Sequence, residues 1–273
     1  MARTLLKGKL MTPERGVSLV AKIPTCLHAV IAKFTATLIH KTRCDVAYKG
    51  LEKAFPSIRH TDKQRLSRTS AYNQLMSLFR WLHIDKQNIQ AEGVNEIKHA
   101  ASERQGGIVL SLHLGIADAP TWVLNQNGIE TKTIVGAGSD GNNKESQWVA
   151  ALLEHRDCPY ISRSDNFIVQ AIQNINHGCW LMFHCDMNAP GEKHTFFTHP
   201  TQIPAIGIQL AMLSNTPIYF SYGWQDGDIY RTKFTKFETK ENFEQSVSHL
   251  VEQMETTIRS HPEHWIWHYN RWK

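Results

Sequence analysis

The sequence lacks paired cysteines. Its cysteines are odd in number and form no C-x-x-C pair, standing at Cys26, Cys44, Cys158, Cys179 and Cys185. A small secreted scaffold held by disulfides would need an even set of cysteines. The pattern therefore predicts reduced thiols and a cytosolic setting.

A long apolar run is also missing. A helix that spans a bilayer needs about 20 consecutive apolar residues. The nearest candidate, residues 23–32, is much shorter and lies between Lys22 and Lys33. The N-terminal residues show no apolar segment with a cleavage site of the kind a signal peptide has. We expect a soluble protein or one that rests on a membrane surface.

Negative charge is in the minority. The chain has 30 Lys and Arg against 25 Asp and Glu, a net charge of +5. This balance suits an anionic partner, such as phospholipid, phosphorylated glycolipid, an acidic carrier protein or nucleic acid. The C-terminal HWIWHYNRWK interleaves aromatic and basic residues, as single-strand-binding surfaces do. It equally suits a membrane interface or a packed terminal segment. With no recognisable nucleic-acid-binding fold, we expect no nucleic-acid partner.

The first hundred residues carry helical patterns. In residues 14–42 apolar residues recur mostly at helical spacing, interrupted by Pro24 and interleaved with Lys22, Lys33, Lys41 and Arg43. This pattern predicts a helix packed on the core, and the alternative is a face that touches a membrane. Two more helices are expected at residues 45–55 and 61–82, separated by Phe55-Pro56-Ser57. Thr61 or Asp62 can cap the second of them.

Beyond residue 100, short apolar runs alternate with amphipathic stretches. Strands are expected at residues 107–112, 131–135, 179–184, 216–222 and 228–237, and helices at 119–127, 143–155, 165–177, 203–213 and 241–260. The alternation predicts an α/β fold with a mostly parallel central sheet flanked by helices. Without repeats or linkers, we expect a single domain over residues 1–273. Residues 1–100 would form a mainly helical N-terminal part, and residues 101–273 the α/β core.

A histidine directly follows the first expected strand. His113 would lie at the carboxyl end of that strand, where open α/β sheets form their sites, and Asp118 would begin the next helix. A carboxylate that accepts from one imidazole nitrogen leaves the other nitrogen free to take a proton from a hydroxyl. The alternative is structural, with Asp118 as an N-cap ahead of Pro120 and His113 as a core histidine.

Three more stretches lie in order around this element: YKGLEKAFPSIRHTDKQRL (48–66), FHCDMNAPGEKHTFF (183–197) and HPEHWIWHYNRWK (261–273). Together with HLGIAD (113–118) they resemble the late acyltransferases of lipid A biosynthesis, within the wider glycerolipid and lysophospholipid acyltransferase superfamily. The resemblance covers about residues 40–273. Its landmarks are the His-x-x-x-x-Asp motif, a helix that ends in Phe-Pro, an acidic residue followed by an aromatic pair, and a Trp-x-x-x-Arg-Trp-Lys ending.

The resemblance implies roles for particular residues. His113 would be the general base and Asp118 its orienting partner, while Arg163, Asp186 and Arg271 would bind substrate. Arg163, or a backbone N–H near Gly115, would stabilise the oxyanion of a thioester-to-hydroxyl transfer. The other matched landmarks are Phe55, Pro56, Phe196, Phe197, Pro262, Glu263, Trp267, Trp272 and Lys273.

Two departures from the family pattern bear on the donor. The motif has Ile116-Ala117 where the family commonly has Asn-Trp, and a long apolar N-terminal segment is replaced by the charged, Pro-broken residues 14–42. Both changes argue against the usual long-chain donor. The chain is also similar to a divergent branch that transfers glycine from a carrier-protein thioester to lipid A.

The resemblance thus implies transfer of an acyl or aminoacyl group from a carrier-protein thioester to a hydroxyl of lipid A or its precursor. The protein would act peripherally on the cytoplasmic side of the inner membrane, with an acidic acyl or peptidyl carrier protein as partner. The alternatives are acylation of another glycolipid or a lysophospholipid, and a lipid-binding protein with a dead site.

A metal site is a weaker interpretation of one cluster. His184, Cys185, Asp186 and His194 are metal-ligating residue types, but their spacing matches no common zinc template. The chain has 15 histidines, so some of them lie near one another in the sequence without forming a metal site. We expect no metal and no cofactor, since the donor would be a thioester.

Overall fold

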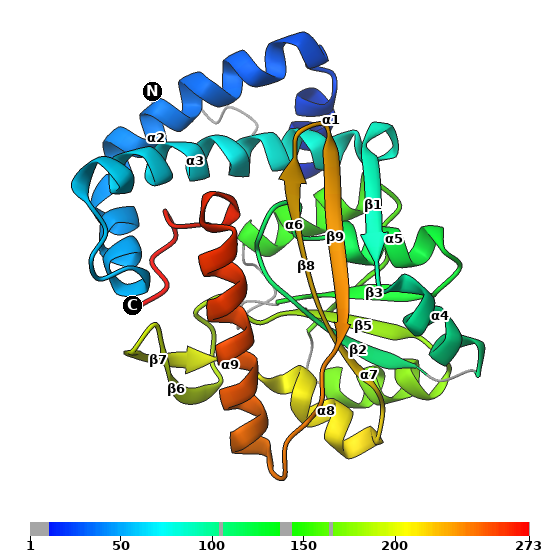
Figure 1. The fold of residues 1–273 in the computed structure, drawn as a ribbon. Helices are drawn as coiled ribbons and strands as arrows, with labels where there is room; N and C mark the ends of the chain where they lie inside the picture. The colour runs from blue at the N-terminus through cyan, green and yellow to red at the C-terminus, as the bar shows by residue number, and fades with distance from the viewer. Residues whose placement is uncertain (1–10, 104–105, 137–143, 164–165, 273) are drawn as a thin grey trace, which may run out of the picture.

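A computed structural model describes residues 11–103, 106–136, 144–163 and 166–272 (Figure 1). The helices are α1 (Pro13–Ala21), α2 (Thr25–Ala54), α3 (His60–Leu82), α4 (Val94–Ser102), α5 (Ala119–Gln126), α6 (Lys144–Glu154), α7 (Phe167–Asn176), α8 (Ile206–Ser214) and α9 (Phe243–Ser260), with short 3-10 turns at Ile84–Lys86 and Pro262–His264. The strands are β1 (Asn88–Glu92), β2 (Gly107–Ser111), β3 (Thr131–Val135), β4 (Tyr160–Ser162), β5 (Trp180–His184), β6 (Glu192–Phe196), β7 (His199–Ile203), β8 (Ile218–Asp226) and β9 (Ile229–Lys236).

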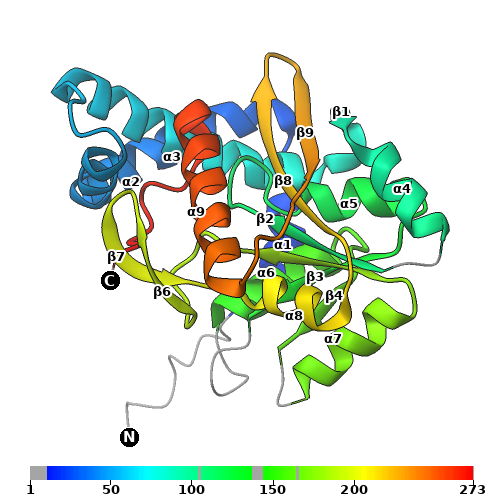
Figure 2. The same cartoon turned by 60° about the horizontal axis from the view of Figure 1, so that its bottom comes forward.

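The central sheet has seven strands in the order β1-β9-β8-β2-β5-β3-β4. Every neighbouring pair is parallel except β8 and β9, which form an antiparallel hairpin. A separate hairpin, β6–β7, lies beside α9 (Figure 2). The expected α/β class with a mostly parallel sheet is confirmed.

Helices cover both faces of the sheet because side chains on its central strands alternate in direction. On one face, Leu110 and Phe183 pack with residues of α7, α8 and α9 in the largest buried cluster. On the other face, Val109 and Met182 pack with residues of α4 and α5. The central strands are therefore buried on both sides, as parallel strands usually are.

The long helices of the N-terminal part pack against each other along the top of the molecule in Figure 1. Small residues of α2, Ala32 and Ala36, are buried, and α2 and α3 are in extensive contact. The predicted boundary between helices at 14–42 and 45–55 is confirmed, because α2 consists of two helical segments joined by a kink at Arg43, whose backbone is not helical (φ −133°, ψ 16°). The predicted cap of the next helix is wrong, because α3 begins at His60 and Asp62 accepts a hydrogen bond from Arg59.

Five elements escaped the sequence patterns: α4, β1, β4, β6 and β7. Strand β1, NIQAE, is largely exposed and forms one edge of the sheet, where it pairs with β9. Strand β4 spans three residues at the opposite edge. Edge strands bury few side chains, so they leave little apolar alternation in the sequence.

The C-terminal segment is held by the N-terminal helices. Ser70 Oγ and Gln74 Nε2 of α3 donate to the carbonyl oxygens of Trp265 and His264, both at 2.6 Å. Within the described ranges no single helix is long and apolar enough to cross a membrane, although α1 and α2, bent by 118°, reach that composition as a pair. That the chain forms a single domain stays a prediction.

Candidate active site

Strand register brings His113 beside Asp186. Strands β2 and β5 are parallel neighbours in which Ser111 is paired with His184. His113 lies two residues beyond the end of β2, and Asp186 lies two residues beyond the end of β5. Because parallel strands end at the same edge of a sheet, the two side chains meet there.

The Asp186 carboxylate accepts three hydrogen bonds. Its Oδ1 accepts from Nδ1 of His113 at 2.8 Å, and its Oδ2 accepts from the backbone N–H of His113 at 2.9 Å and from Nε1 of Trp265 at 2.7 Å. Asp186 is completely buried, whereas the His113 side chain is 30% exposed. Asp186 thus fixes the ring of His113 and leaves Nε2 as its remaining nitrogen.

Ionisation in this pair follows from burial and charge. Burial favours the neutral forms of both groups, but each stabilises the charge of its partner. The proximity and hydrogen bond of Asp186 hold the pKa of His113 above its ordinary value, with a further contribution from the charge of Asp118. Conversely, burial would raise the pKa of Asp186, but His113 and the hydrogen bond from Trp265 hold it well below its usual range. His113 is therefore a strengthened base.

Asp118 lies elsewhere than expected. It precedes α5 as the N-cap residue, but its side chain makes no capping hydrogen bond. Instead its Oδ1 accepts from Oγ1 of Thr133 on β3 at 3.2 Å. Among the described residues no hydrogen bond joins Asp118 to His113, so the expected contact is replaced by that of Asp186. The physical reason is that register places Asp186 directly beside Nδ1, while α5 packs against β3 and directs Asp118 there.

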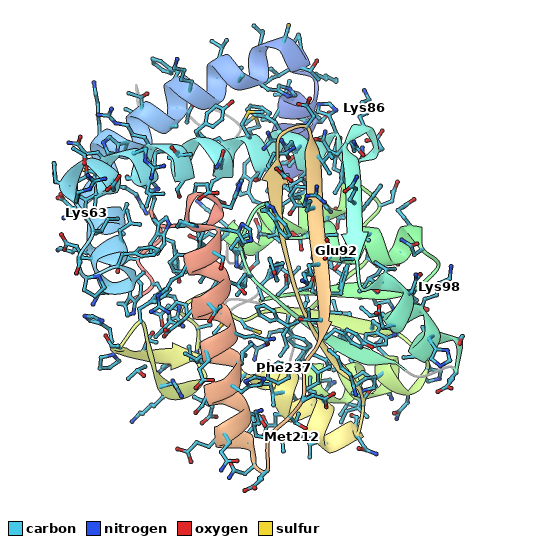
Figure 3. All side chains as sticks on the ribbon, in the orientation of Figure 1. Lys63, Lys86, Glu92, Lys98, Met212 and Phe237 are labelled. Carbon is cyan, nitrogen blue, oxygen red and sulfur yellow. The ribbon has the colours of Figure 1, made fainter. Side chains whose placement is uncertain are left out.

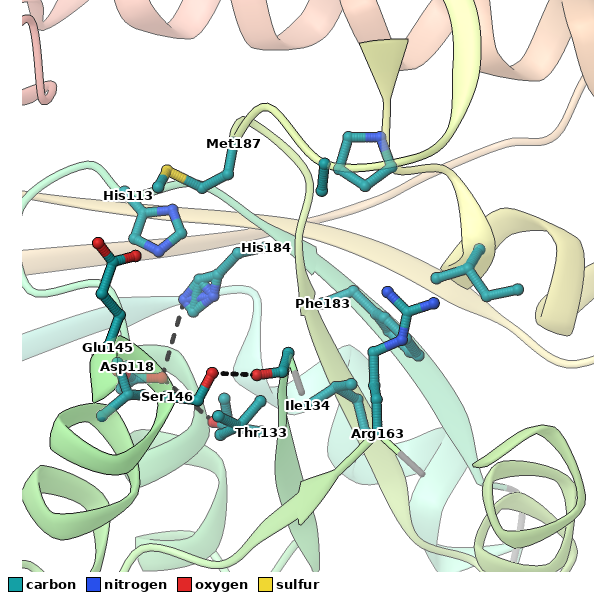
Figure 4. Close-up of a pocket in the computed structure, with 16 residues that line it drawn as sticks. His113, Asp118, Thr133, Ile134, Glu145, Ser146, Arg163, Phe183, His184 and Met187 are labelled. Atoms are coloured by element: carbon teal, nitrogen blue, oxygen red, sulfur yellow. Dashed lines mark hydrogen bonds and ion pairs between the residues drawn. The ribbon is translucent and has the colours of Figure 1, made fainter. Parts of the chain in front are cut away.

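His184, the last residue of β5, lies between these groups (Figure 4). Its ring centroid is 4.3 Å from that of His113, and its Nε2 is 3.8 Å from Oδ1 of Asp118. That Nε2 is buried and has no hydrogen-bond partner among the residues described. Burial, with the nearby His113 charge, lowers the pKa of His184 to about 3. Burial also raises the pKa of Asp118 to about 6.

The turn after His113 requires glycine at position 115, and its backbone N–H groups form hydrogen bonds within the protein. Gly115 has φ +67°, and a Cβ there would lie 2.6 Å from the carbonyl oxygen of Gly223. The N–H of Gly115 donates to the His264 carbonyl at 3.1 Å, and that of Ile116 donates to the Tyr230 hydroxyl at 2.8 Å. These amides are therefore engaged within the protein, which leaves Arg163 as the expected oxyanion donor.

The two arginines take different positions. Arg163 is exposed and lines the same cleft as His113, with its guanidinium 5.5 Å from the Phe167 ring centroid. Arg271 is completely buried, donates to Oγ1 of Thr201 and the carbonyl of Gln202, and lies 5.3 Å from the Phe196 ring centroid. This differs from the expected substrate-binding role, because aromatic packing encloses the C-terminal segment. Lys273 lies outside the described residues.

A cleft of about 380 Å³ opens over these groups. Its polar lining includes His113, Asp118, Thr133, Glu145, Ser146, Arg163 and His184, and its apolar lining includes Ile134, Val149, Phe183, Met187, Pro204 and Ile206. In the part of the chain that the structure describes, no three His, Cys, Asp or Glu side chains are placed to hold a metal. His194, considered above as a ligand, bonds to Oγ of Ser248 instead.

Sequence reasoning missed the positions of two residues. The sequence pattern indicates His184 only as a possible metal ligand, and nothing in the C-terminal aromatic run distinguishes Trp265 from its neighbours. A buried strand that ends in a histidine two residues before an aspartate was the available signal for His184. Trp265 forms an isolated β-bridge with Leu114, which brings the C-terminal segment to the site. No local pattern predicts that contact.

Comparison with known families agrees with this geometry. A sequence model described as bacterial lipid A biosynthesis acyltransferase matches residues 15–273. No curated protein matches the sequence. Because the match covers nearly the whole chain and includes every residue of the cleft, the protein belongs to the bacterial lipid A biosynthesis acyltransferase family and is an acyltransferase that acts in lipid A synthesis.

Proposed function

We propose that the protein transfers an acyl or aminoacyl group from a carrier-protein thioester to a hydroxyl of lipid A or its precursor. The observation that supports this most directly is the His113–Asp186 pair at the edge of the cleft. A histidine whose Nδ1–H is held by a buried carboxylate offers Nε2 as a general base. The chain has no need of its own nucleophile, since the hydroxyl of the acceptor attacks.

The reaction proceeds by addition and elimination. His113 Nε2 takes the proton of the acceptor hydroxyl as the oxygen attacks the thioester carbonyl, and Asp186 stabilises the imidazolium that forms. The tetrahedral intermediate carries a negative oxygen, for which we propose Arg163 as the donor. Collapse breaks the carbon–sulfur bond, and His113 returns its proton to the departing thiolate. The products are an ester and the free thiol of the carrier.

The donor would be presented by an acidic carrier protein. The net charge of +5 favours such a partner, and contact between opposite charges speeds association and weakens with salt. A carrier-bound thioester should therefore be used in preference to the same group on coenzyme A. If coenzyme A thioesters were used efficiently and carrier forms were not, the donor assignment would be wrong and a lysophospholipid acceptor would be favoured.

We also propose that α2 rests peripherally on the cytoplasmic surface of the inner membrane. Four large apolar side chains of this helix are exposed on one stripe, with values between 45% and 76% for Leu27, Val30, Phe34 and Leu38. Residues 15–44 contain basic residues and no acidic ones. An apolar stripe flanked by positive charge is typical of helices that lie in the headgroup region of anionic bilayers.

Vesicle flotation tests this placement. Phe34→Ser should release the protein from vesicles that contain phosphatidylglycerol, while Lys98→Gln, on α4 far from α2 in Figure 3, should leave binding intact. Equal flotation of the Phe34→Ser variant would exclude this face as the membrane contact.

The transfer itself is tested with purified protein, a lipid A precursor and carrier-bound donors, followed by mass spectrometry of the lipid. Wild-type protein should add the mass of the donor group, and His113→Ala should reduce the rate by roughly 10²–10⁴-fold. Near-normal turnover by a folded His113→Ala variant would rule out the mechanism. Lipid binding without product from any donor would instead identify a lipid-binding protein.

A further inference from the structure

The carboxylate of Asp118 lines the cleft beside His113. Orientation of His113 is carried out by Asp186, and the helix N-terminus makes no use of the Asp118 side chain. Among the residues that the structure describes, one hydrogen bond, from Thr133, reaches this carboxylate. An ionised carboxylate has about four acceptor sites, so several remain unused beside the cleft.

The second available group is Nε2 of His184. It is buried, has no hydrogen-bond partner within the described part of the chain, and lies 3.8 Å from Oδ1 of Asp118, which is too long for a direct hydrogen bond. The lowered pKa of His184 keeps its ring neutral near pH 7. With the proton on Nδ1, its Nε2 is an acceptor. In this tautomer Nε2 of His184 and the carboxylate of Asp118 are two acceptors, one of them anionic, that lie 3.8 Å apart at the cleft.

The chemistry of a matching group follows from these two acceptors. Such a group must offer at least two N–H or O–H donors from one atom and carry positive charge to complement Asp118. A protonated primary amine has three N–H donors on one nitrogen and meets both requirements. A hydrocarbon chain in the same place would bury both acceptors without partners, at about 1–3 kcal/mol for each.

Because the Asp118–His184 gap is next to His113, the amine of the donor must be close to the carbonyl that reacts. The His184 ring is 4.3 Å from the ring of His113, which must reach the attacking hydroxyl. An amine in the Asp118–His184 gap is therefore close to the reacting carbonyl, as in an α-aminoacyl group. In Figure 4, Glu145 lies on the Asp118 side of the cleft and Arg163 on the opposite side, so negative groups gather where the amine would lie.

We propose that Asp118 and His184 form a subsite for the protonated amine of an aminoacyl donor. The inference rests on the proposed function, because it assigns the donor of that same transfer. The amine takes no part in the bond changes. It is held by Asp118 and His184 while the carbonyl beside it passes from thiol to hydroxyl.

Near-isosteric donors test the proposal. Glycyl and propionyl groups on one carrier protein differ by an ammonium in place of a methyl group, and a dodecanoyl group on the same carrier represents fatty donors. A site built to bind a polar group rejects analogues that lack it, so wild-type kcat/KM should favour glycyl over propionyl by at least about 100-fold. Dodecanoyl transfer should be weaker than glycyl transfer.

Variants of the subsite should reduce this preference. Asp118→Asn and His184→Leu should each lower the glycyl-to-propionyl ratio by about tenfold or more, mainly through loss of glycyl transfer. Val169→Ala, at an exposed position of α7 that does not line the cleft, should leave the ratio within about threefold of wild type. Retained propionyl transfer by the variants shows that they are folded and that the base still works.

Two groups of outcomes would overturn the inference. Equal use of glycyl and propionyl by wild type, an unchanged ratio in both variants, or a preference for dodecanoyl would each exclude the amine subsite. In these cases His113-dependent transfer would still stand. Absence of product from every carrier-bound donor would instead overturn the proposed function, and the inference with it.

Discussion

Replacing Asp186 with asparagine tests the pair on which the mechanism depends. Asp186 accepts three hydrogen bonds, two of them at Oδ2 and one at Oδ1. An asparagine has one acceptor oxygen and one NH₂ donor. The oxygen should take the Oδ2 position, where the His113 amide and the Trp265 indole both donate. The NH₂ group would then face Nδ1 of His113.

This arrangement reverses the tautomer of His113. Facing a donor, Nδ1 must be unprotonated, so the proton moves to Nε2, which can no longer act as a base. The opposite orientation of the amide would set its NH₂ against two N–H donors. Loss of base function together with loss of the stabilising charge should lower the transfer rate by roughly 10²–10⁴-fold. This corresponds to about 3–5.5 kcal/mol in activation free energy.

The pH profile gives an independent measurement. The free base of His113 is the active form, so kcat/KM should rise with pH through the pKa of His113, which Asp186 holds above its ordinary value. In the residual activity of the Asp186→Asn variant, this acidic limb should lie at lower pH, because the charge that stabilises the His113 imidazolium has been removed. Asp118→Asn serves as the control, because Asp118 contributes less to the pKa of His113 and does not contact Nδ1. The acidic limb of the Asp118→Asn variant should move less than that of the Asp186→Asn variant.

The reasoning fails if Asp186→Asn, shown by thermal melting to be folded, turns over within about threefold of wild type. It fails equally if Asp118→Asn shifts the acidic limb further than Asp186→Asn does. The second result would restore Asp118 as the orienting carboxylate that the sequence motif predicted.

Other predictions follow from the same contacts. Trp265→Phe removes the 2.7 Å hydrogen bond to Asp186 but keeps an aromatic ring, so urea denaturation should show a loss of about 1.5–3 kcal/mol; unchanged stability would exclude a contribution from this bond. Arg271→Met should lower stability by about 1–3 kcal/mol without raising KM for the lipid acceptor; a raised KM at normal stability would favour substrate binding. Burial lowers the pKa of His184 to about 3 and that of His268 to about 4, whereas the unfolded chain binds protons near pH 6.5, so stability should fall as pH drops from about 6.5 to 4; constant urea midpoints would contradict this. Exhaustive treatment with EDTA should leave transfer unchanged, and loss of activity that zinc restores would show a metal-dependent reaction.

The sequence by itself determined much of the fold. Five strands and most helices were evident, because their residues either form short continuous apolar runs or repeat with the period of the element. His113 was also evident, since it directly follows a fully buried strand. The weak edge strand β1 was not, because its pairing with β9 decides whether such an exposed segment forms a strand.

Only the tertiary structure decided which carboxylate holds His113. The sequence favoured Asp118, five residues away along the chain, while Asp186 is distant in sequence. Pairing of β2 with β5 in the register Ser111 to His184 places Asp186 beside Nδ1, and no local pattern encodes the neighbour or the register of a parallel strand. The same pairing brings His184 toward Asp118, and the bridge from Leu114 to Trp265 completes the surroundings of Asp186. The sequence therefore predicted His113 as the base. Long-range pairing of β2 with β5 placed Asp186, and not the motif residue Asp118, against its Nδ1, and Asp118 lines the cleft instead.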